Sequence, residues 1–293
     1  MSADRLTVQA HAKLNLFLRV LARESDGFHG IETLFCLVSL ADTIGVERRA
    51  GMGVSVDVTG ADVGPPEQNL AVRAAAMVLE ATGRRFAVHL TLEKRIPLRA
   101  GLGGGSSDAA ATLLAVNRLA ENAVPRHELL QFAARLGSDV PFFLAGSPLA
   151  LGWGRGERLL ALPPLPAAPA LLVTPPIGIG TAEAYGWVDA ARQSAGRRGA
   201  VALDLDALSR WGDIGRLAGN DFESAVFGRV AEIRAAFEAL VGTQPLVCRM
   251  SGSGSTLFAI YRSARDRDDA RAVLGRKHGR IDAVETLVAN PAS

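Results

Sequence analysis

The sequence is poor in cysteine and contains no long apolar run. Its two cysteines, Cys36 and Cys248, lie far apart and form no CxxC pair, so neither a zinc site nor a disulfide framework is indicated. No run of about eighteen apolar residues is free of charges and turn signals, which argues against a membrane-spanning helix. The N-terminal segment also lacks the apolar core of a signal peptide. We therefore expect a cytoplasmic protein without a membrane partner.

Charge of one sign is not in excess either. The chain has 32 Lys and Arg residues against 30 Asp and Glu, which gives a formal net charge of +2. Nucleic-acid binding generally needs an excess of cations to neutralise phosphates, so we expect no nucleic-acid partner. The 293 residues, 48% of them hydrophobic, are enough for a real core and exclude a disordered chain. No heptad repeat or extended apolar stripe stands out, so the sequence does not determine the oligomeric state.

Alternating apolar and polar residues predict strands in the first half of the chain. From Leu6 to Val20 the alternation has the period of two that is typical of a half-buried strand. Further strands are expected over 34–40, 51–60 and 86–96, with helices over 108–117 and 126–137. A helix is also predicted over 70–82, because Asn69 is a suitable N-cap residue and Gly83 a suitable C′ residue.

A proline-rich passage, 163–169, indicates a boundary between a domain of residues 1–162 and a domain of residues 163–293. Beyond it we expect strands over 170–173, 256–261 and 283–288, and helices near 182–191, 220–240 and 265–276. Strands and helices are mixed without a strict βαβ rhythm. The predicted fold class is therefore α+β.

The densest glycine cluster, Gly101 to Ser107, joins a predicted strand to a predicted helix. Such a loop turns backbone N–H groups toward a ligand, and the helix start adds partial positive charge, which is typical of an anion site. No lysine ends the loop as in Walker A, and Ser106 stands where the dinucleotide fingerprint needs a glycine. The alternative is a flexible turn capped by Ser106 or Ser107. Because ordering four glycines within five positions costs backbone entropy, we favour a phosphate or nucleotide role.

Lys13 and Asn15 lie on the polar face of the first predicted strand. A solvated edge is the ordinary interpretation of such residues. The chain has only three lysines among its 32 basic residues, however. A lysine at this position therefore indicates a need for a compact ammonium group rather than the planar fork of arginine.

Three further segments are open to two interpretations each. Asp139 precedes the apolar stretch Val140–Leu144, so it is either a turn-forming cap or a carboxylate with a functional partner. Phe28 and His29 suit stacking and hydrogen bonding to a nucleobase, or they form a buried corner. The turn Ser251–Gly254 faces a ligand or only joins two strands.

Seven segments in order across nearly the whole chain resemble the GHMP small-molecule kinases. They are Ala12–Leu16 (AKLNL), Asp26–His29 (DGFH), Pro97–Asp108, Leu136–Pro141 (LGSDVP), Gly154–Glu157 (GRGE), Asn220–Glu223 (NDFE) and Met250–Gly254 (MSGSG). The glycine loop alone indicates the superfamily. The AKLNL, DGFH and SDVP segments narrow the resemblance to the branch that phosphorylates 4-diphosphocytidyl-2-C-methyl-D-erythritol in non-mevalonate (MEP) isoprenoid biosynthesis.

The resemblance implies a two-domain GHMP kinase fold with the active site in the inter-domain cleft. It implies transfer of the γ-phosphoryl group of ATP, with Mg²⁺, to the 2-hydroxyl of the cytidine diphosphate substrate, giving the 2-phosphate and ADP. Asp139 would accept the hydroxyl proton, and Lys13 beside it would favour the ionised carboxylate and stabilise transferred charge.

The resemblance also assigns the binding residues. Those for ATP are Pro97, Gly101, Leu102, Gly103, Gly104, Gly105, Ser106 and Ser107, with Ser106 or Ser107 near Mg²⁺. Those for the substrate are Asn15, Phe28, His29, Asp139, Thr181 and Tyr185. Within this set Asn15 and His29 would hydrogen-bond the cytidine end. Phe28 and Tyr185 would lie on either side of the cytosine ring.

Two positions depart from the family pattern. Phe28 stands where the family usually has tyrosine, which keeps a stacking ring but removes its hydroxyl. Arg99 stands where the family tends to have glycine, and it either contacts phosphate or points to solvent. Neither departure touches Lys13 or Asp139.

Two other hypotheses compete with this one. The first is another GHMP kinase, acting on a sugar, homoserine or a mevalonate-like alcohol, but such substrates offer no base for Phe28, His29 and Tyr185 to bind. The second is a nucleotide-binding regulator that has lost catalysis. The presence of both Lys13 and Asp139 argues against a regulator.

Overall fold

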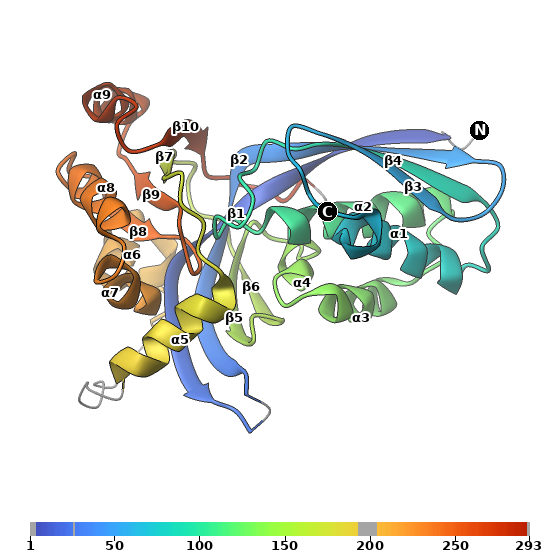
Figure 1. Cartoon of the computed structure of the whole chain (residues 1–293), viewed down its shortest axis with the longest axis horizontal. Helices are drawn as coiled ribbons and strands as arrows, with labels where there is room; N and C mark the ends of the chain where they lie inside the picture. The colour runs from blue at the N-terminus through green and yellow to red at the C-terminus, as the bar shows by residue number, and fades with distance from the viewer. Residues whose placement is uncertain (1–3, 26, 193–203, 292–293) are drawn as a thin grey trace.

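The computed structural model describes residues 4–25, 27–192 and 204–291, which form two β-sheets flanked by helices (Figure 1). Asp26, in the predicted turn before Phe28, lies outside the described residues. The first sheet comprises β1 (Arg5–Arg23), β2 (His29–Arg49), β3 (Val54–Thr59), β4 (Ala87–Glu93), β5 (Leu149–Gly154) and β6 (Arg158–Leu162). Its strand order is β3-β4-β2-β5-β6, with β1 paired to β2.

Helices cover one face of the first sheet (Figure 1). They are α1 (Leu70–Ala81), α2 (Gly104–Leu119), α3 (Arg126–Leu136) and α4 (Val140–Phe143). In α1 the buried residues Ala71, Ala74, Ala75 and Val78 recur at intervals of three and four, so one face of the helix packs into the core. Asn69 caps this helix through its side chain, which accepts from the backbone N–H of Ala71.

The second sheet has the order β10-β7-β9-β8. Its strands are β7 (Pro169–Thr174), β8 (Val247–Met250), β9 (Leu257–Ile260) and β10 (Arg280–Glu285). The helices of this half are α5 (Thr181–Arg192), α6 (Trp211–Leu217), α7 (Asp221–Phe227), α8 (Ala231–Val241) and α9 (Ala264–Leu274). The first sheet ends at Leu162 and the second begins at Pro169, while the division of the chain after residue 162 stays a prediction.

A long antiparallel hairpin of β1 and β2 joins the two halves. It runs along the first sheet and continues past α5, as the two blue strands of Figure 1 show. In the middle of β1 both faces are buried. Ala12, Leu14 and Leu16 pack into a core cluster that also contains residues of the second sheet, and burying a leucine there contributes roughly 1.5–3 kcal/mol. Side chains alternate along a strand, so Lys13 and Asn15 point the other way.

The predicted elements are largely confirmed, with local differences. The helix expected over 108–117 begins at Gly104, directly from the glycine loop. The helix expected near 220–240 is two helices, α7 and α8, which are separated at residues 228–230. The β5–β6 hairpin and β8 had not been predicted. Both cysteines are free and buried. Among the described residues, no helix has the length and apolar character needed to span a membrane.

Candidate active site

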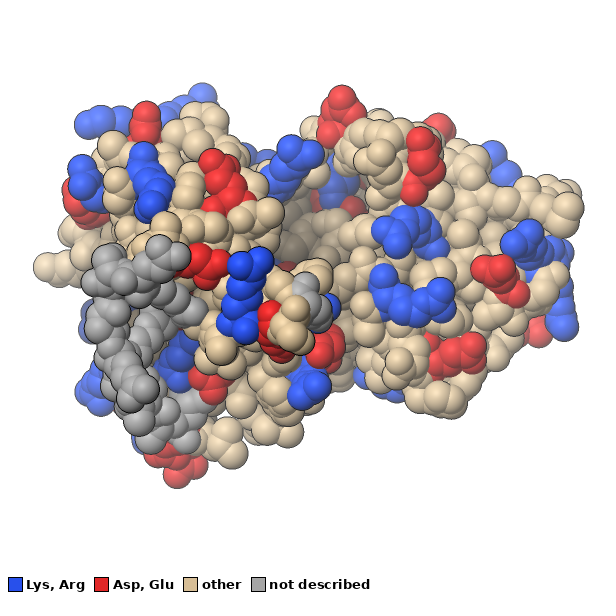
Figure 2. All heavy atoms as spheres, turned by 60° about the horizontal axis from the view of Figure 1, so that its bottom comes forward, with Lys and Arg blue, Asp and Glu red and all other residues tan. Residues whose placement is uncertain are grey.

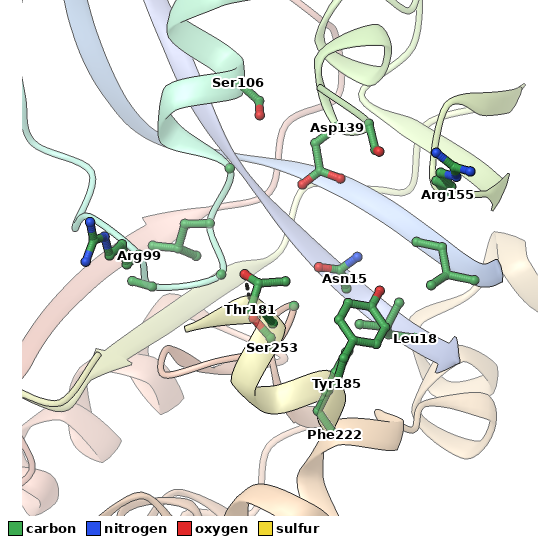
Figure 3. A pocket seen from close by; sticks show the side chains of 18 of the residues that line it. Asn15, Leu18, Arg99, Ser106, Asp139, Arg155, Thr181, Tyr185, Phe222 and Ser253 are labelled. Atoms are coloured by element: carbon green, nitrogen blue, oxygen red, sulfur yellow. Dashed lines mark hydrogen bonds between the residues drawn. The ribbon is translucent and has the colours of Figure 1, made fainter. Parts of the chain in front are cut away.

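A cavity of about 1060 Å³ lies between the two halves, and Figure 2 shows it as a hollow between two lobes. The first half contributes residues of β1, the tip of the β1–β2 hairpin, the glycine loop and the segment before α4. The second half contributes α5, Phe222 and the turn at Gly252 and Ser253. Figure 3 shows Arg99 and Arg155 on opposite sides of this cavity, with Asp139 between them.

The glycine loop is fixed on both sides. The backbone N–H of Lys13 donates to the carbonyl of Leu102 at 3.0 Å, and the Ser251 hydroxyl donates to the carbonyl of Gly101 at 2.9 Å. Gly101 has a φ of +78°, and a Cβ there would lie 2.0 Å from the Ser251 carbonyl oxygen. Only glycine therefore permits this contact between the two halves.

The start of α2 faces the cavity. Gly103 precedes the helix with a φ of +71°, and Gly104, Gly105 and Ser106 line the cavity. The first N–H groups of a helix have no intrahelical partner and carry partial positive charge, so this end of the cavity suits an anion.

The two serines of the loop are not equivalent. Ser106 lines the cavity and its side chain is drawn there in Figure 3. Ser107 is buried, does not line the cavity, and its backbone N–H donates to the carbonyl of Gly103. The structure therefore brings Ser106, and not Ser107, to the cavity surface.

Lys13 and Asp139 meet in the middle of the cavity. Lys13 Nζ lies 3.5 Å from Asp139 Oδ2, and it donates to Asn15 Oδ1 at 2.6 Å. The Asp139 side chain makes no capping hydrogen bond to α4, so its carboxylate remains available to Lys13 and to a ligand. Lys13 is 3% exposed, and burial lowers its pKa although the charge of Asp139 opposes this effect.

Asn15 uses both ends of its amide within the protein. Its oxygen accepts from Lys13, and its nitrogen donates to Thr33 Oγ1 at 2.8 Å. The structure therefore places Asn15 beside Lys13, in the middle of the cavity. Contact between Asn15 and the cytidine end of a substrate stays a prediction.

Aromatic residues line the other end of the cavity. Tyr185, on α5, stacks on His29 with ring centroids 4.9 Å apart and meets the edge of Phe222 at 5.0 Å. Phe28 is 57% exposed, and the guanidinium of Arg155 lies 4.0 Å from its ring centroid. Burial, with a smaller contribution from the Asp139 charge, raises the pKa of Tyr185 to about 12, so its hydroxyl stays protonated.

The remaining predicted positions also line the cavity. Thr181, at the start of α5, lies 3.4 Å from Ser253 between their hydroxyl oxygens. Pro97 and Leu102 line it beside the glycines. Arg99 is exposed at the cavity edge with a φ of +51°, a conformation that suits the glycine more usual in the family.

Several residues that the sequence did not single out also contribute. Asp189 and Arg155 line the cavity. Behind the glycine loop, the buried ammonium of Lys94 donates to the carboxylates of Asp42 and Asp108, and burial raises the pKa of Asp108. Because Lys94 is one of only three lysines, the scarcity that drew attention to Lys13 could also have found it.

Comparison with known proteins identifies the family. The profile described as "GHMP kinases N terminal domain" matches residues 69–147, and "GHMP kinases C terminal" matches residues 182–281. The 4-diphosphocytidyl-2-C-methyl-D-erythritol kinase of Solibacter usitatus is 42% identical over 261 residues, covering 87% of this chain and 81% of the relative. The enzyme of that name from Moorella thermoacetica is 40% identical over 276 residues, covering 93% and 95%.

Solved structures agree with the sequence comparison. The crystal structure of 4-(cytidine 5'-diphospho)-2C-methyl-D-erythritol kinase superposes with a TM-score of 0.81 at 35% identity, covering 96% of this chain and 99% of that one. A homoserine kinase from Cytophaga hutchinsonii has a TM-score of 0.75 at 20% identity, covering 100% and 97%, which shows the shared fold alone. The predicted α+β fold and family resemblance are thus confirmed. The chain belongs to the GHMP kinases and, within them, to the 4-diphosphocytidyl-2-C-methyl-D-erythritol kinase family of ATP-dependent small-molecule kinases.

Proposed function

We propose that this chain transfers the γ-phosphoryl group of ATP to the 2-hydroxyl of 4-diphosphocytidyl-2-C-methyl-D-erythritol. The products are the 2-phosphate and ADP, in the MEP route to isoprenoid precursors. The observation that carries the proposal is the Lys13–Asp139 pair, 3.5 Å apart in a cavity with an anion-binding helix start at one end and aromatic side chains at the other. Membership of the family supports it.

Asp139 accepts the proton of the attacking hydroxyl group. Its side chain is 30% exposed and lines the cavity, and its carboxylate has no capping role, so a substrate hydroxyl can reach it. Such general-base assistance contributes about 10²–10⁴-fold to a rate. Lys13 stabilises the negative charge of the transferred group, while Asn15 holds the ammonium in place.

The glycine loop and the start of α2 bind the ATP phosphates. Phosphoryl transfer depends mainly on positioning and on neutralising charge, and the N–H groups at Gly104, Gly105 and Ser106 do both. Pro97 and Arg99 border the same end of the cavity. The Ser107 backbone N–H is already used within the helix, since it donates to the carbonyl of Gly103, so it does not contact the phosphates.

The donor set fits a magnesium ion that arrives with ATP. Mg²⁺ keeps several waters and is usually bound by substrate phosphates with one or two protein oxygens, rather than by an all-protein cage. The hydroxyl of Ser106 lies at the phosphate end of the cavity and would supply one such oxygen. Ser106 would hold the ion, which when bound neutralises phosphate charge.

The aromatic end of the cavity binds the cytidine diphosphate group. Phe28 and Tyr185 provide faces on which a cytosine ring stacks, which is worth about 1–3 kcal/mol per base. His29 provides a hydrogen bond to the edge of the base, and Thr181 lines the same half of the cavity. We retain as predictions the division into domains 1–162 and 163–293, the cytoplasmic compartment, and the lack of nucleic-acid and membrane partners.

A panel of alcohols tests the proposal. ATP consumption is measured with Mg²⁺ and the cytidine diphosphate substrate, and in parallel with mevalonate, homoserine and galactose. We expect turnover only with the cytidine compound, because the other alcohols offer no base to the aromatic residues. Turnover with another alcohol instead would support a different GHMP kinase. A folded, ATP-binding protein that phosphorylates none of them would contradict the assignment and support a regulator.

A further inference from the structure

His29 is held from two directions at the start of β2. Its Nε2 lies 2.7 Å from Asp189 Oδ1, and its ring stacks on Tyr185 with the two planes 13° apart. Tyr185 and Asp189 are four residues apart on α5, so one face of this helix makes both contacts. His29 is 8% exposed, and these contacts fix the orientation of its imidazole.

Asp189 determines which nitrogen of His29 carries the proton. A carboxylate oxygen only accepts hydrogen bonds, so Nε2 donates its hydrogen to Asp189. In a neutral imidazole the other nitrogen, Nδ1, is then an acceptor. Nδ1 makes no hydrogen bond to any residue that the structure describes, and His29 lines the cavity. His29 Nδ1 is therefore a hydrogen-bond acceptor that is available to a ligand in the cavity.

This acceptor distinguishes the two pyrimidine bases. On the hydrogen-bonding edge of cytosine only the exocyclic amine donates, whereas N3 and O2 accept. Uracil has a carbonyl oxygen in place of that amine, which would face Nδ1 as a second acceptor. A site that leaves buried polar groups unpaired rejects the wrong ligand strongly.

We propose that Asp189 is a specificity-determining residue, which selects cytosine over uracil by holding His29 in the tautomer whose Nδ1 accepts from the amine of the base. The inference rests on the proposed function, since it assumes that the base lies at the aromatic end of the cavity. Asp189 touches none of the reacting groups and acts through His29, so it is a positioning residue. Its side chain is 35% exposed, so its replacement does not disturb a packed core.

The test compares the cytidine substrate with its uridine counterpart. In the wild-type chain kcat/KM is expected to favour the cytidine compound by about 100-fold or more. In Asp189→Asn the amide both donates and accepts, so His29 can adopt either tautomer. The preference is then expected to fall by at least about tenfold, through KM, with kcat for the cytidine compound changed by less than about threefold.

Glu183→Gln is the matched control. Glu183 lies on the same helix, is exposed and does not line the cavity, and His29 pairs with Asp189 instead, so the Glu183 variant removes the same charge and should keep the wild-type preference. A second readout does not depend on catalysis. The ¹⁵N NMR shifts of the His29 ring, assigned with His29→Gln, should show the Nε2–H tautomer in the wild-type chain and a mixture in Asp189→Asn.

The outcomes separate this inference from the proposed function. If the wild-type chain does not phosphorylate the cytidine compound, the proposed function fails, and this inference fails with it. If it does, but accepts the uridine compound equally, or if Asp189→Asn keeps the full preference, only the inference is overturned. An equal loss with both substrates, or an Nδ1–H tautomer in the wild-type chain, also overturns it.

Discussion

Lys13 is a charged residue that is almost fully buried. Its side chain is 4% exposed, and its ammonium has two neighbours that stabilise charge, Asn15 at 2.6 Å and Asp139 at 3.5 Å. Burial disfavours the charged form more than these neighbours favour it, so the pKa of Lys13 is lowered from 10.5. Lys13, which we propose stabilises the transferred charge, therefore loses its proton more readily than an ordinary lysine.

This lowered pKa predicts an alkaline limit to the reaction. Only protonated Lys13 neutralises phosphoryl charge, and a lowered pKa means that the proton is lost at a lower pH than from an ordinary lysine. We expect kcat/KM to fall on the alkaline side with a midpoint below 10.5, measured as a pH–rate profile at substrate concentrations well below KM. Lys13→Arg is the control. Its guanidinium stays charged, so any residual activity of this variant should not fall over the same alkaline pH range. A wild-type rate that stays constant through that range would contradict the role.

At the residue scale the sequence was informative where composition was unusual. The scarcity of lysine pointed to Lys13, and the segment LGSDVP pointed to Asp139 through its family resemblance. Asp189 could not be found in this way. It is one of many acidic residues on the helices. The role that we propose for it depends on its contact with His29, which lies 160 residues earlier in the chain.

The glycine loop shows how an element depends on a contact from the other half of the chain. Its Gly101 carbonyl accepts from Ser251, and the backbone N–H of Thr256 donates to the Ala100 carbonyl at 3.2 Å. The turn Ser251–Gly254 therefore does more than join β8 to β9, because it is hydrogen-bonded to the glycine loop. The sequence left open whether this turn faces a ligand or only joins two strands. The structure shows that it joins β8 to β9 and that Ser253 also lines the cavity.

Gly101→Ala is expected to destabilise the protein. A non-glycine residue at a φ of +78° is strained, and the new Cβ would lie 2.0 Å from the carbonyl oxygen of Ser251. Strain of this kind costs about 1–3 kcal/mol, and the displaced turn adds to it. Thermal unfolding measures the effect.

Gly105→Ala is the control. The nearest neighbour of a Cβ at Gly105 lies 3.8 Å away, and the φ of Gly105 is not positive. The free energy of unfolding of this variant should therefore be unchanged or higher by about 0.4–1 kcal/mol. Equal destabilisation in both variants would contradict the role of this contact.

At the element scale, periodicity predicted the long strands and capped helices and missed short strands, among them the glycine-containing β5. In β5 the missing side chain of Gly152 leaves room for the ring of Phe35, since a Cβ there would lie 2.8 Å from the ring. A glycine in a sequence usually predicts the end of a strand, but here Gly152 allows close packing within one. Similarly, α2 begins among glycines because its first turn is held by the loop rather than by helix propensity.

The whole molecule is organised around the junction of its two halves. Asn220 donates from its side-chain amide to the carbonyls of Met250 and Gly252, each at 2.7 Å, and the Asp221 carboxylate accepts from the backbone N–H of Val20. The NDFE segment, quoted only as part of the family resemblance, thus joins β1, α7 and the Ser251–Gly254 turn. The cavity lies at this junction, so Lys13 and Asp139 of one half and α5 of the other line it together.

Local patterns could not predict this arrangement. The strand order β10-β7-β9-β8 and the pairing of the hairpin with the second half depend on contacts between distant segments, which periodicity does not encode. The α+β class and the order of elements were predictable from the sequence. The placement of the cleft came from the family resemblance, and its details came from the structure.

The most direct test of the whole account is the turnover of Asp139→Asn together with its affinity for ATP. The substitution keeps the size of the side chain and removes its ability to accept a proton. We expect kcat for the cytidine diphosphate substrate to fall by about 10²–10⁴-fold. The dissociation constant for ATP should change by less than about threefold, since the phosphate-binding loop is untouched. A variant that keeps kcat within about threefold of the wild-type value would contradict the account, because the reaction would then proceed without the carboxylate on which the site is built.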